Sequence, residues 1–186
     1  SFDKPTVIPF RQYLAWCSFS FVAVFFEPTD RRKANKPFLN QHRVTFATPN
    51  RAELIAIART LQPELKISSG ILNVDETLSL CSAVSNYVQC IIVTLGENGV
   101  MIVKRDHNNL AGRLYPVKRI ENLTNVSGAG DSFASGFLHG LLEELDEEYC
   151  VSLGFNAAHN TLQCETTVPK EFNMQENIRK ADYIKL

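Results

Sequence analysis

The sequence lacks several features that would assign it to large classes of protein. Its 186 residues carry 19 Lys and Arg against 20 Asp and Glu, for a net charge of −1. Without a basic excess, nothing indicates nucleic acid as a partner. The longest apolar stretch, residues 19–26, is far shorter than the roughly 20 residues that a membrane-crossing helix needs. We therefore expect no nucleic acid and no membrane as a partner.

Cysteine pairs and metal-ligand spacings are also absent from the sequence. The cysteines are an odd, scattered set without a Cys-x-x-Cys pattern, namely Cys17, Cys81, Cys90, Cys150 and Cys164. Such a set is typical of reduced thiols in an intracellular protein rather than of disulfides or a zinc site. The 4 histidines form no metal-ligand pattern either. These absences favour a cytoplasmic location.

Two common phosphate-binding signatures are missing as well. The sequence contains no Gly-x-x-x-x-Gly-Lys-Ser/Thr segment, and no Gly-x-Gly-x-x-Gly segment stands at a strand-to-helix turn. Both signatures work by aiming backbone N–H groups of a glycine-rich turn at phosphate oxygens. Their absence disfavours a nucleotide-binding α/β domain of the P-loop or dinucleotide-binding kind.

What is present is an ordinary globular composition, 45% hydrophobic and 21% charged, in which strand and helix patterns alternate. Apolar and β-branched runs predict strands at 19–27, 44–48, 90–95, 100–104 and 114–117. Helical spacing of apolar residues predicts helices at 50–61, 75–87, 130–142, 147–162 and 175–181. Such alternation indicates an α/β fold, a sheet covered by helices, with residues 1–186 in one domain.

The most informative stretch is Asn-Val-Ser-Gly-Ala-Gly-Asp at 125–131, which opens an apolar helix. Backbone N–H groups at such a turn, aided by the helix dipole, form a site for phosphate. Asp131 stands in the same turn, where its carboxylate can take a proton from an attacking hydroxyl. An anion site beside a base is what phosphoryl transfer from a nucleotide requires. The alternative is ordinary capping of a helix by an acidic residue.

Asn50 and Glu53 follow a predicted strand, within Pro-Asn-Arg-Ala-Glu at 49–53. As N-cap and N3 residues of the next helix, they fit the capping-box pattern. The strand ends of α/β sheets also face the ligand crevice, so the same side chains are candidates to hold Mg²⁺ and its waters. Both interpretations stay open at this point.

A second glycine-containing segment, Thr-Leu-Gly-Glu-Asn-Gly at 94–99, ends the most apolar predicted strand. As a structural element it predicts a tight hairpin turn in which Gly99 has a positive φ. As a functional element it is a glycine-lined edge of backbone along which a nucleotide lies. Thr94, Gly96 and Gly99 are the candidate contacts.

In their order and spacing, the Asn-x-x-Glu, Thr-Leu-Gly-x-x-Gly and Gly-Ala-Gly-Asp segments closely resemble the C-terminal half of the ribokinase-like (PfkB) carbohydrate kinases. The resemblance covers about residues 19–169. It implies a ribokinase-like central, mostly parallel sheet flanked by helices. It also implies ATP and Mg²⁺ as cofactors and a small-molecule sugar or nucleoside as substrate.

The resemblance further implies a role for each candidate residue. Asp131 would be the general base that deprotonates the substrate hydroxyl. Backbone N–H groups would bind the charge that develops on the γ-phosphoryl group, namely those of Gly128, Ala129, Gly130 and Asp131. Asn50 and Glu53 would hold Mg²⁺. The nucleotide would be lined by Thr94, Gly96, Gly99 and Asn156.

Two departures from the family pattern limit what it implies. Asn125 and Val126 stand where the family usually has Asp-Thr. Because that Asp commonly helps to hold a monovalent cation, activation by K⁺ is in doubt. The family's N-terminal portion, with a Gly-Gly substrate motif and a small β lid, is not visible in these residues, so we expect a truncated chain, an isoform or a fragment. The rival hypothesis is a catalytically silent chain that acts by binding a partner.

Glu-Pro-Thr-Asp at 27–30, followed by Lys-Ala at 33–34 and Lys-Pro-Phe at 36–38, looks like one branch of the family. That branch is the kinase portion of eukaryotic bifunctional pseudouridine-metabolising proteins, in which the kinase is fused to a glycosidase. The resemblance implies pseudouridine as substrate, with ribose, adenosine and fructose as alternatives, and a fused glycosidase domain upstream. A plain turn after a strand is the other interpretation of Glu-Pro-Thr-Asp. A homodimer is left open.

Overall fold

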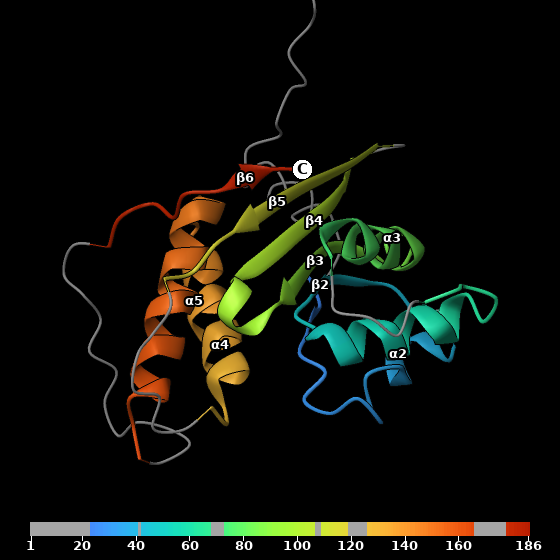
Figure 1. Ribbon diagram of the computed structural model, residues 1–186, viewed down its shortest axis with the longest axis horizontal. Coiled ribbons are helices and arrows are strands. Elements are labelled where there is room, and N and C mark those ends of the chain that lie inside the picture. Colours follow the sequence, from blue (N-terminus) through green and yellow to red (C-terminus); the bar gives the residue numbers. More distant parts are fainter. Residues whose placement is uncertain (1–22, 41, 68–72, 107–108, 119–125, 166–177) are drawn as a thin grey trace, which may run out of the picture. The chain divides into compact units, whose positions relative to one another are not determined.

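The computed structural model describes residues 23–40, 42–67, 73–106, 109–118, 126–165 and 178–186 (Figure 1). The chain divides into two compact units. The sheet unit comprises Ala23–Asn122 and Asp182–Leu186. The described part of the other, the helical unit, lies within Leu123–Ala181.

The sheet unit is built on a six-stranded sheet in which strand order follows chain order. The strands are β1 (Phe25–Phe26), β2 (Val44–Ala47), β3 (Val88–Thr94), β4 (Val100–Asp106), β5 (Asn109–Tyr115) and β6 (Ile184–Lys185). The first three strands are parallel, and each later strand is antiparallel to the one before it. Few residues separate β3 from β4 and β4 from β5 in the sequence, and such short connections permit only antiparallel pairing. The α/β class is therefore confirmed, and the parallel arrangement spans β1 to β3.

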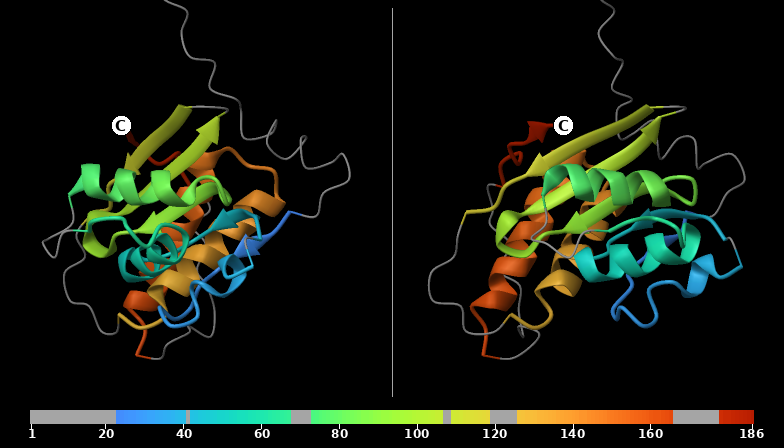
Figure 2. Two further views of the ribbon diagram at one scale, coloured as in Figure 1. Left: turned by 90° about the vertical axis from the view of Figure 1, so that its right-hand side faces the viewer. Right: turned by 45° about the vertical axis from the view of Figure 1, so that its right-hand side comes forward.

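Two helices connect β2 to β3 and pack on one face of the sheet (Figure 2), α2 (Arg51–Leu61) and α3 (Val74–Val84). Leu54 of α2 and Leu80 of α3 are buried in the same core as Ile91 and Met101 of the sheet. Full burial of a side chain of this size stabilises the fold by about 1.5–3 kcal/mol. The shared core therefore fixes both helices on the sheet.

The helical unit contains α4 (Ala129–Leu142) and α5 (Glu147–Leu162), which lie side by side (Figure 1). Glycines let the two backbones approach closely. A Cβ added to Gly136 of α4 would lie 2.5 Å from the carbonyl oxygen of Leu153 on α5. The pair is also joined by the buried hydroxyls of Ser132 and Thr161, which are 2.7 Å apart. This packing fixes the helix that begins with the Gly-Ala-Gly turn.

Several elements differ from the sequence-based prediction, including α3, which ends at Val84 rather than at residue 87, and β6, which was not predicted. The described strand at the N-terminal side is only β1, and residues 19–22 lie outside the described residues. β5 begins at residue 109 rather than 114, because its pairing with β4 continues back to the Asp106–Asn109 pair. The helix expected at 175–181 is wrong for the described residues 178–181, which have no regular structure. That segment is instead tied to the start of α5, where the Ala181 N–H donates to the Glu148 carbonyl at 3.1 Å.

Two further observations concern the described part of the chain. None of its helices combines the length and the apolar character needed to span a bilayer. Its cysteines, Cys81, Cys90, Cys150 and Cys164, are free thiols, and Cys17 lies outside the described residues.

Candidate functional site

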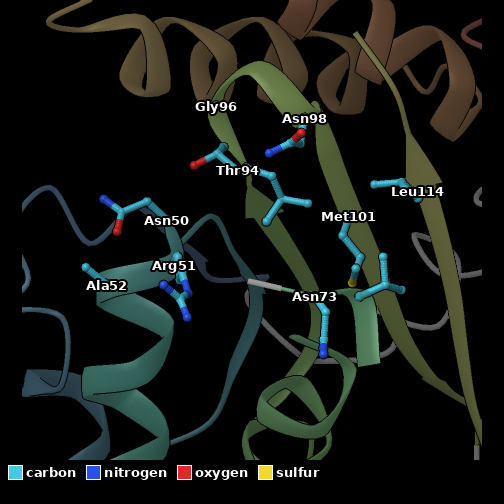
Figure 3. Close-up of a pocket in the computed structure, with 11 residues that line it drawn as sticks. Asn50, Arg51, Ala52, Asn73, Thr94, Gly96, Asn98, Met101 and Leu114 are labelled. Carbon is cyan, nitrogen blue, oxygen red and sulfur yellow. The ribbon is translucent and has the colours of Figure 1, made fainter. Parts of the chain in front are cut away.

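A pocket of about 980 Å³ opens in the sheet unit, where β3 ends beside the first turns of α2 and α3 (Figure 3). Three of the predicted site residues, Asn50, Thr94 and Gly96, line it. The end of β3 is joined directly to the start of α2, because the Thr94 N–H donates to the Pro49 carbonyl at 3.0 Å. The fold thus brings together candidates that are more than 40 residues apart in the sequence.

The start of α2 forms the predicted capping box. The Asn50 side-chain oxygen accepts from the Glu53 N–H at 3.1 Å. In return, Glu53 Oε2 accepts from the Asn50 N–H at 2.8 Å. Glu53 is only 4% exposed, so backbone and burial together hold its carboxylate in one orientation. The capping role is confirmed, and a role in holding Mg²⁺ stays a prediction.

The predicted hairpin is confirmed, because β3 and β4 pair antiparallel, and the turn between them contains a short 3₁₀ helix, Gly96–Asn98. Gly99 follows with φ +90°, as predicted, and a Cβ there would overlap the carbonyl oxygen of Tyr115. Gly96 also has a positive φ, +60°, but a Cβ on it would meet no atom within 4 Å. Gly99 is therefore required by the fold, while the backbone at Gly96 is open to a ligand.

The donors near Asn50 fit a magnesium ion that keeps its waters. Among the described residues, no three His, Cys, Asp or Glu side chains gather to hold a metal. One carboxylate and one amide, those of Glu53 and Asn50, instead match the way Mg²⁺ binds through water beside substrate phosphates. The nearby Thr48 hydroxyl is buried and has no hydrogen-bond partner in the described part of the chain. Unmet hydrogen-bonding capacity at this strand end is consistent with bound water or ligand there.

The Gly-Ala-Gly-Asp turn forms the start of α4 in the helical unit. Gly128 is the N-cap, with φ +80°, and as a glycine it has no side chain to cap the first turn of α4. The first helical bond is made by the Ser132 N–H to the Gly128 carbonyl at 2.9 Å. A Cβ on Gly130 would meet no atom within 4 Å, and Asp131 is exposed. The first-turn N–H groups and the carboxylate of Asp131 are therefore accessible to a ligand.

The remaining predicted residues are placed as follows. Asn156 lies on α5 and is half-buried, and its side-chain oxygen accepts from Asn160 Nδ2 at 3.1 Å. Val126 is 70% exposed. Asn125 lies outside the described residues, so the departure from the family pattern at that position has no structural account.

Several lining residues of the pocket escaped the sequence analysis, namely Arg51, Asn73, Asn98, Met101 and Leu114. A signal for Asn73 exists, because Asn-x-x-Glu at 73–76 repeats the pattern at 50–53. The Asn73 side chain indeed caps α3 by accepting from the Glu76 N–H at 2.7 Å. Met101 and Leu114 face each other in the register of β4 and β5, which no local pattern predicts.

Two curated relatives of this chain have names that refer to pseudouridine. A pseudouridine kinase of Arabidopsis thaliana is 22% identical over 83% of this chain and 53% of its own length. A pseudouridine-metabolizing bifunctional protein of Schizosaccharomyces pombe is 25% identical over 80% of this chain and 26% of its own length. The chain thus spans about half, or less, of the curated relatives that it matches.

Solved structures and a family profile agree with these relatives. A probable sugar kinase from Rhizobium etli has the same fold, with a TM-score of 0.64 and 23% identity over 88% of this chain and 46% of its own. The ribokinase-like fold class is confirmed by this likeness. The profile described as pfkB family carbohydrate kinase matches residues 18–171, most of the sequence. The chain therefore belongs to the pfkB family of carbohydrate kinases.

Proposed function

We propose that residues 1–186 are part of a single kinase domain and supply its nucleotide-binding and catalytic-base portion. The reaction is transfer of the γ-phosphoryl group of ATP to a hydroxyl group of a sugar or nucleoside. The observation that carries this proposal is the first turn of α4, whose N-cap is a glycine without a capping side chain and which contains the exposed carboxylate of Asp131. We place the enzyme in the cytoplasm, on the evidence of its free thiols.

Asp131 acts as the general base in this proposal. Its carboxylate accepts the proton of the substrate hydroxyl while the hydroxyl oxygen bonds to the γ-phosphorus. The bond from that phosphorus to the bridging oxygen breaks, and ADP leaves. The N–H groups of Gly128, Ala129, Gly130 and Asp131 stabilise the charge on the transferring group, aided by the dipole of the 14-residue helix α4. Positioning and electrostatics supply most of the rate in such reactions.

The sheet unit contributes the nucleotide and magnesium contacts. Thr94, Gly96 and Gly99 lie along the nucleotide, and support for this comes from the open backbone at Gly96. Asn50 and Glu53 hold Mg²⁺ and its waters, and the ion neutralises phosphate charge when it is bound. The buried, backbone-held Glu53 needs no rearrangement to orient those waters. Asn156 of the helical unit contacts the adenine ring.

Pseudouridine is the substrate we favour over ribose, adenosine and fructose. The names of two relatives, at 22% and 25% identity, both refer to pseudouridine. The segment Glu-Pro-Thr-Asp at 27–30 supports the same branch. In this proposal the kinase stands downstream of a glycosidase domain, as in bifunctional proteins of that branch. The proposal leaves open whether the chain forms a homodimer and whether its activity depends on K⁺.

A catalytically silent chain is the second candidate function. The observation that favours it is the replacement of the family's Asp-Thr by Asn125-Val126. Such a chain would keep the fold and work by binding a partner rather than by turnover.

The test measures ATP consumption with Mg²⁺ in the presence of pseudouridine, ribose, adenosine or fructose. It compares this chain with a version extended at its N-terminus to the length of the relatives. Turnover with pseudouridine above the other substrates supports the proposal. Turnover with another substrate supports the kinase activity but replaces pseudouridine as the assigned substrate. No turnover with any substrate in either protein favours the silent chain.

A further inference from the structure

We propose that Arg51 binds the polyphosphate of the nucleotide and makes the pocket of the sheet unit select charged nucleotides over nucleosides. This inference rests on the proposed nucleotide-binding function and deepens it. Arg51 lies on the first turn of α2, next to Asn50, and its side chain is 33% exposed. Neither the capping box nor the proposed magnesium site assigns a role to Arg51.

The composition of the pocket points to an anionic ligand. Of the 11 described residues that line it, Arg51 is the one with a charged side chain. The others are apolar or carry neutral amide and hydroxyl groups. Figure 3 shows Asn50 and Arg51 at the start of α2 on one side, with Met101 and Leu114 on the opposite side. A pocket with one positive charge and a partly apolar wall suits a ligand with a negative group and an apolar body.

The side-chain oxygens of the two asparagines in the pocket walls already have partners. Asn50 accepts from the Glu53 N–H, and Asn73 accepts from the Glu76 N–H. These bonds occupy the amide oxygens at the starts of α2 and α3. Among the lining residues, the positive charge available to an incoming phosphate is that of Arg51.

Glu76 of α3 lies close to the guanidinium of Arg51 and is an ionic partner for it. The Arg51 Nη2 to Glu76 Oε2 distance is 3.7 Å, well beyond the roughly 2.7–2.9 Å of a tight charge-assisted hydrogen bond. Both side chains are largely buried, at 33% and 16% exposed, so their charges are less screened than at an open surface. A guanidinium also presents five N–H donors in a fork that matches phosphate oxygens. A phosphate that binds Arg51 therefore competes with the Glu76 carboxylate for the same cation.

The competition predicts opposite effects for two charge-removing substitutions. Arg51→Met removes the phosphate contact but keeps the apolar stem, so we expect ATP and ADP to bind about 10- to 100-fold more weakly. Adenosine binding should stay within about twofold, because adenosine carries no phosphate. Glu76→Gln removes the competing anion, so ATP should bind as tightly as to the native chain or more tightly. Arg59→Met, at an exposed position on the same helix, is the matched control and should change neither.

The experiment is calorimetric titration of the 186-residue chain and these three variants with ATP, ADP and adenosine, each at two salt concentrations. Thermal melts of the same samples report on folding. The inference is supported by loss of ATP binding in Arg51→Met with adenosine binding and melting temperature retained. It is overturned if the native chain binds ATP and Arg51→Met binds it equally well. It is also overturned if Arg51→Met and Glu76→Gln weaken the binding of ATP and of adenosine alike, since that result would mean that the two side chains only support the fold. If the native chain binds neither ATP nor adenosine, the proposed function fails together with this inference.

Discussion

Replacing Gly136 by Ala tests how closely α4 and α5 must pack to hold the Gly-Ala-Gly turn. The added Cβ would lie 2.5 Å from the Leu153 carbonyl oxygen and 3.0 Å from the Ala157 Cβ. Favourable contacts lie about 1 Å farther apart. The nearest obstacle is backbone, which cannot rotate aside, so the helices must separate. Overpacking of this kind costs about 1–3 kcal/mol.

The gain in helix propensity from Gly to Ala, about 1 kcal/mol, offsets part of that cost. Because the obstacle is backbone at 2.5 Å, we take the upper part of the overpacking range and expect a net loss of about 1–2 kcal/mol. For a chain of this length each kcal/mol lowers the melting temperature by about 2–4 °C. The melting temperature of Gly136→Ala should therefore fall by roughly 2–8 °C, as measured by circular dichroism.

Gly130→Ala is the matched control, with the same chemical change on the same helix. A Cβ on Gly130 would meet no atom within 4 Å, so we expect an unchanged or slightly higher melting temperature. Equal stability of Gly136→Ala and the native chain would refute the packing argument. So would an equal loss in Gly130→Ala, because the two sites would then not differ in crowding.

Three further predictions concern the sheet unit. Asn73→Ala removes the side chain that caps α3 through a 2.7 Å bond and should lower the free energy of unfolding by about 1 kcal/mol in urea denaturation. Gly99→Ala combines a φ of +90° with overlap on the Tyr115 carbonyl. It should therefore lower the free energy of unfolding by more than Asn73→Ala does and yield less folded protein on expression. Hydrogen bonds from Arg32 lower the pKa of Asp30 from 3.8 to about 2; NMR titration should find this value, and Arg32→Met should return it toward 3.8. Because the folded-state pKa is depressed, the stabilisation by this pair is present above about pH 4 and is lost as the pH falls toward 2.

Elements defined by local pattern were predicted well from the sequence. The predicted bounds of α5, 147–162, are those of the structure, because an acidic first turn and helical apolar spacing mark them. The capping box at Asn50 and the positive φ of Gly99 were likewise readable from short segments. Each depends on residues within four positions of one another.

Elements defined by distant partners were not predictable in this way. The start of β5 is set by its register on β4. The segment 178–181 follows the surface of α5, where Lys180 pairs with Asp146 at 2.8 Å, and no helix forms. In the pocket, the strand-end residue Thr94 was predicted, whereas Met101 and Leu114 come from strands whose pairing alone places them there. Arg51 was part of a recognised segment, but its position in the pocket depends on where α3 packs.

The most direct test of the account is the phosphorylation rate of Asp131→Asn in the N-terminally extended protein, with pseudouridine and ATP. Glu143→Gln, which removes the same charge at the other end of α4, is the control. The account predicts a rate lowered about 10²- to 10⁴-fold in Asp131→Asn, with the rate of Glu143→Gln close to that of the native enzyme. An undiminished rate in Asp131→Asn would contradict the assignment of the general base and with it the proposed mechanism.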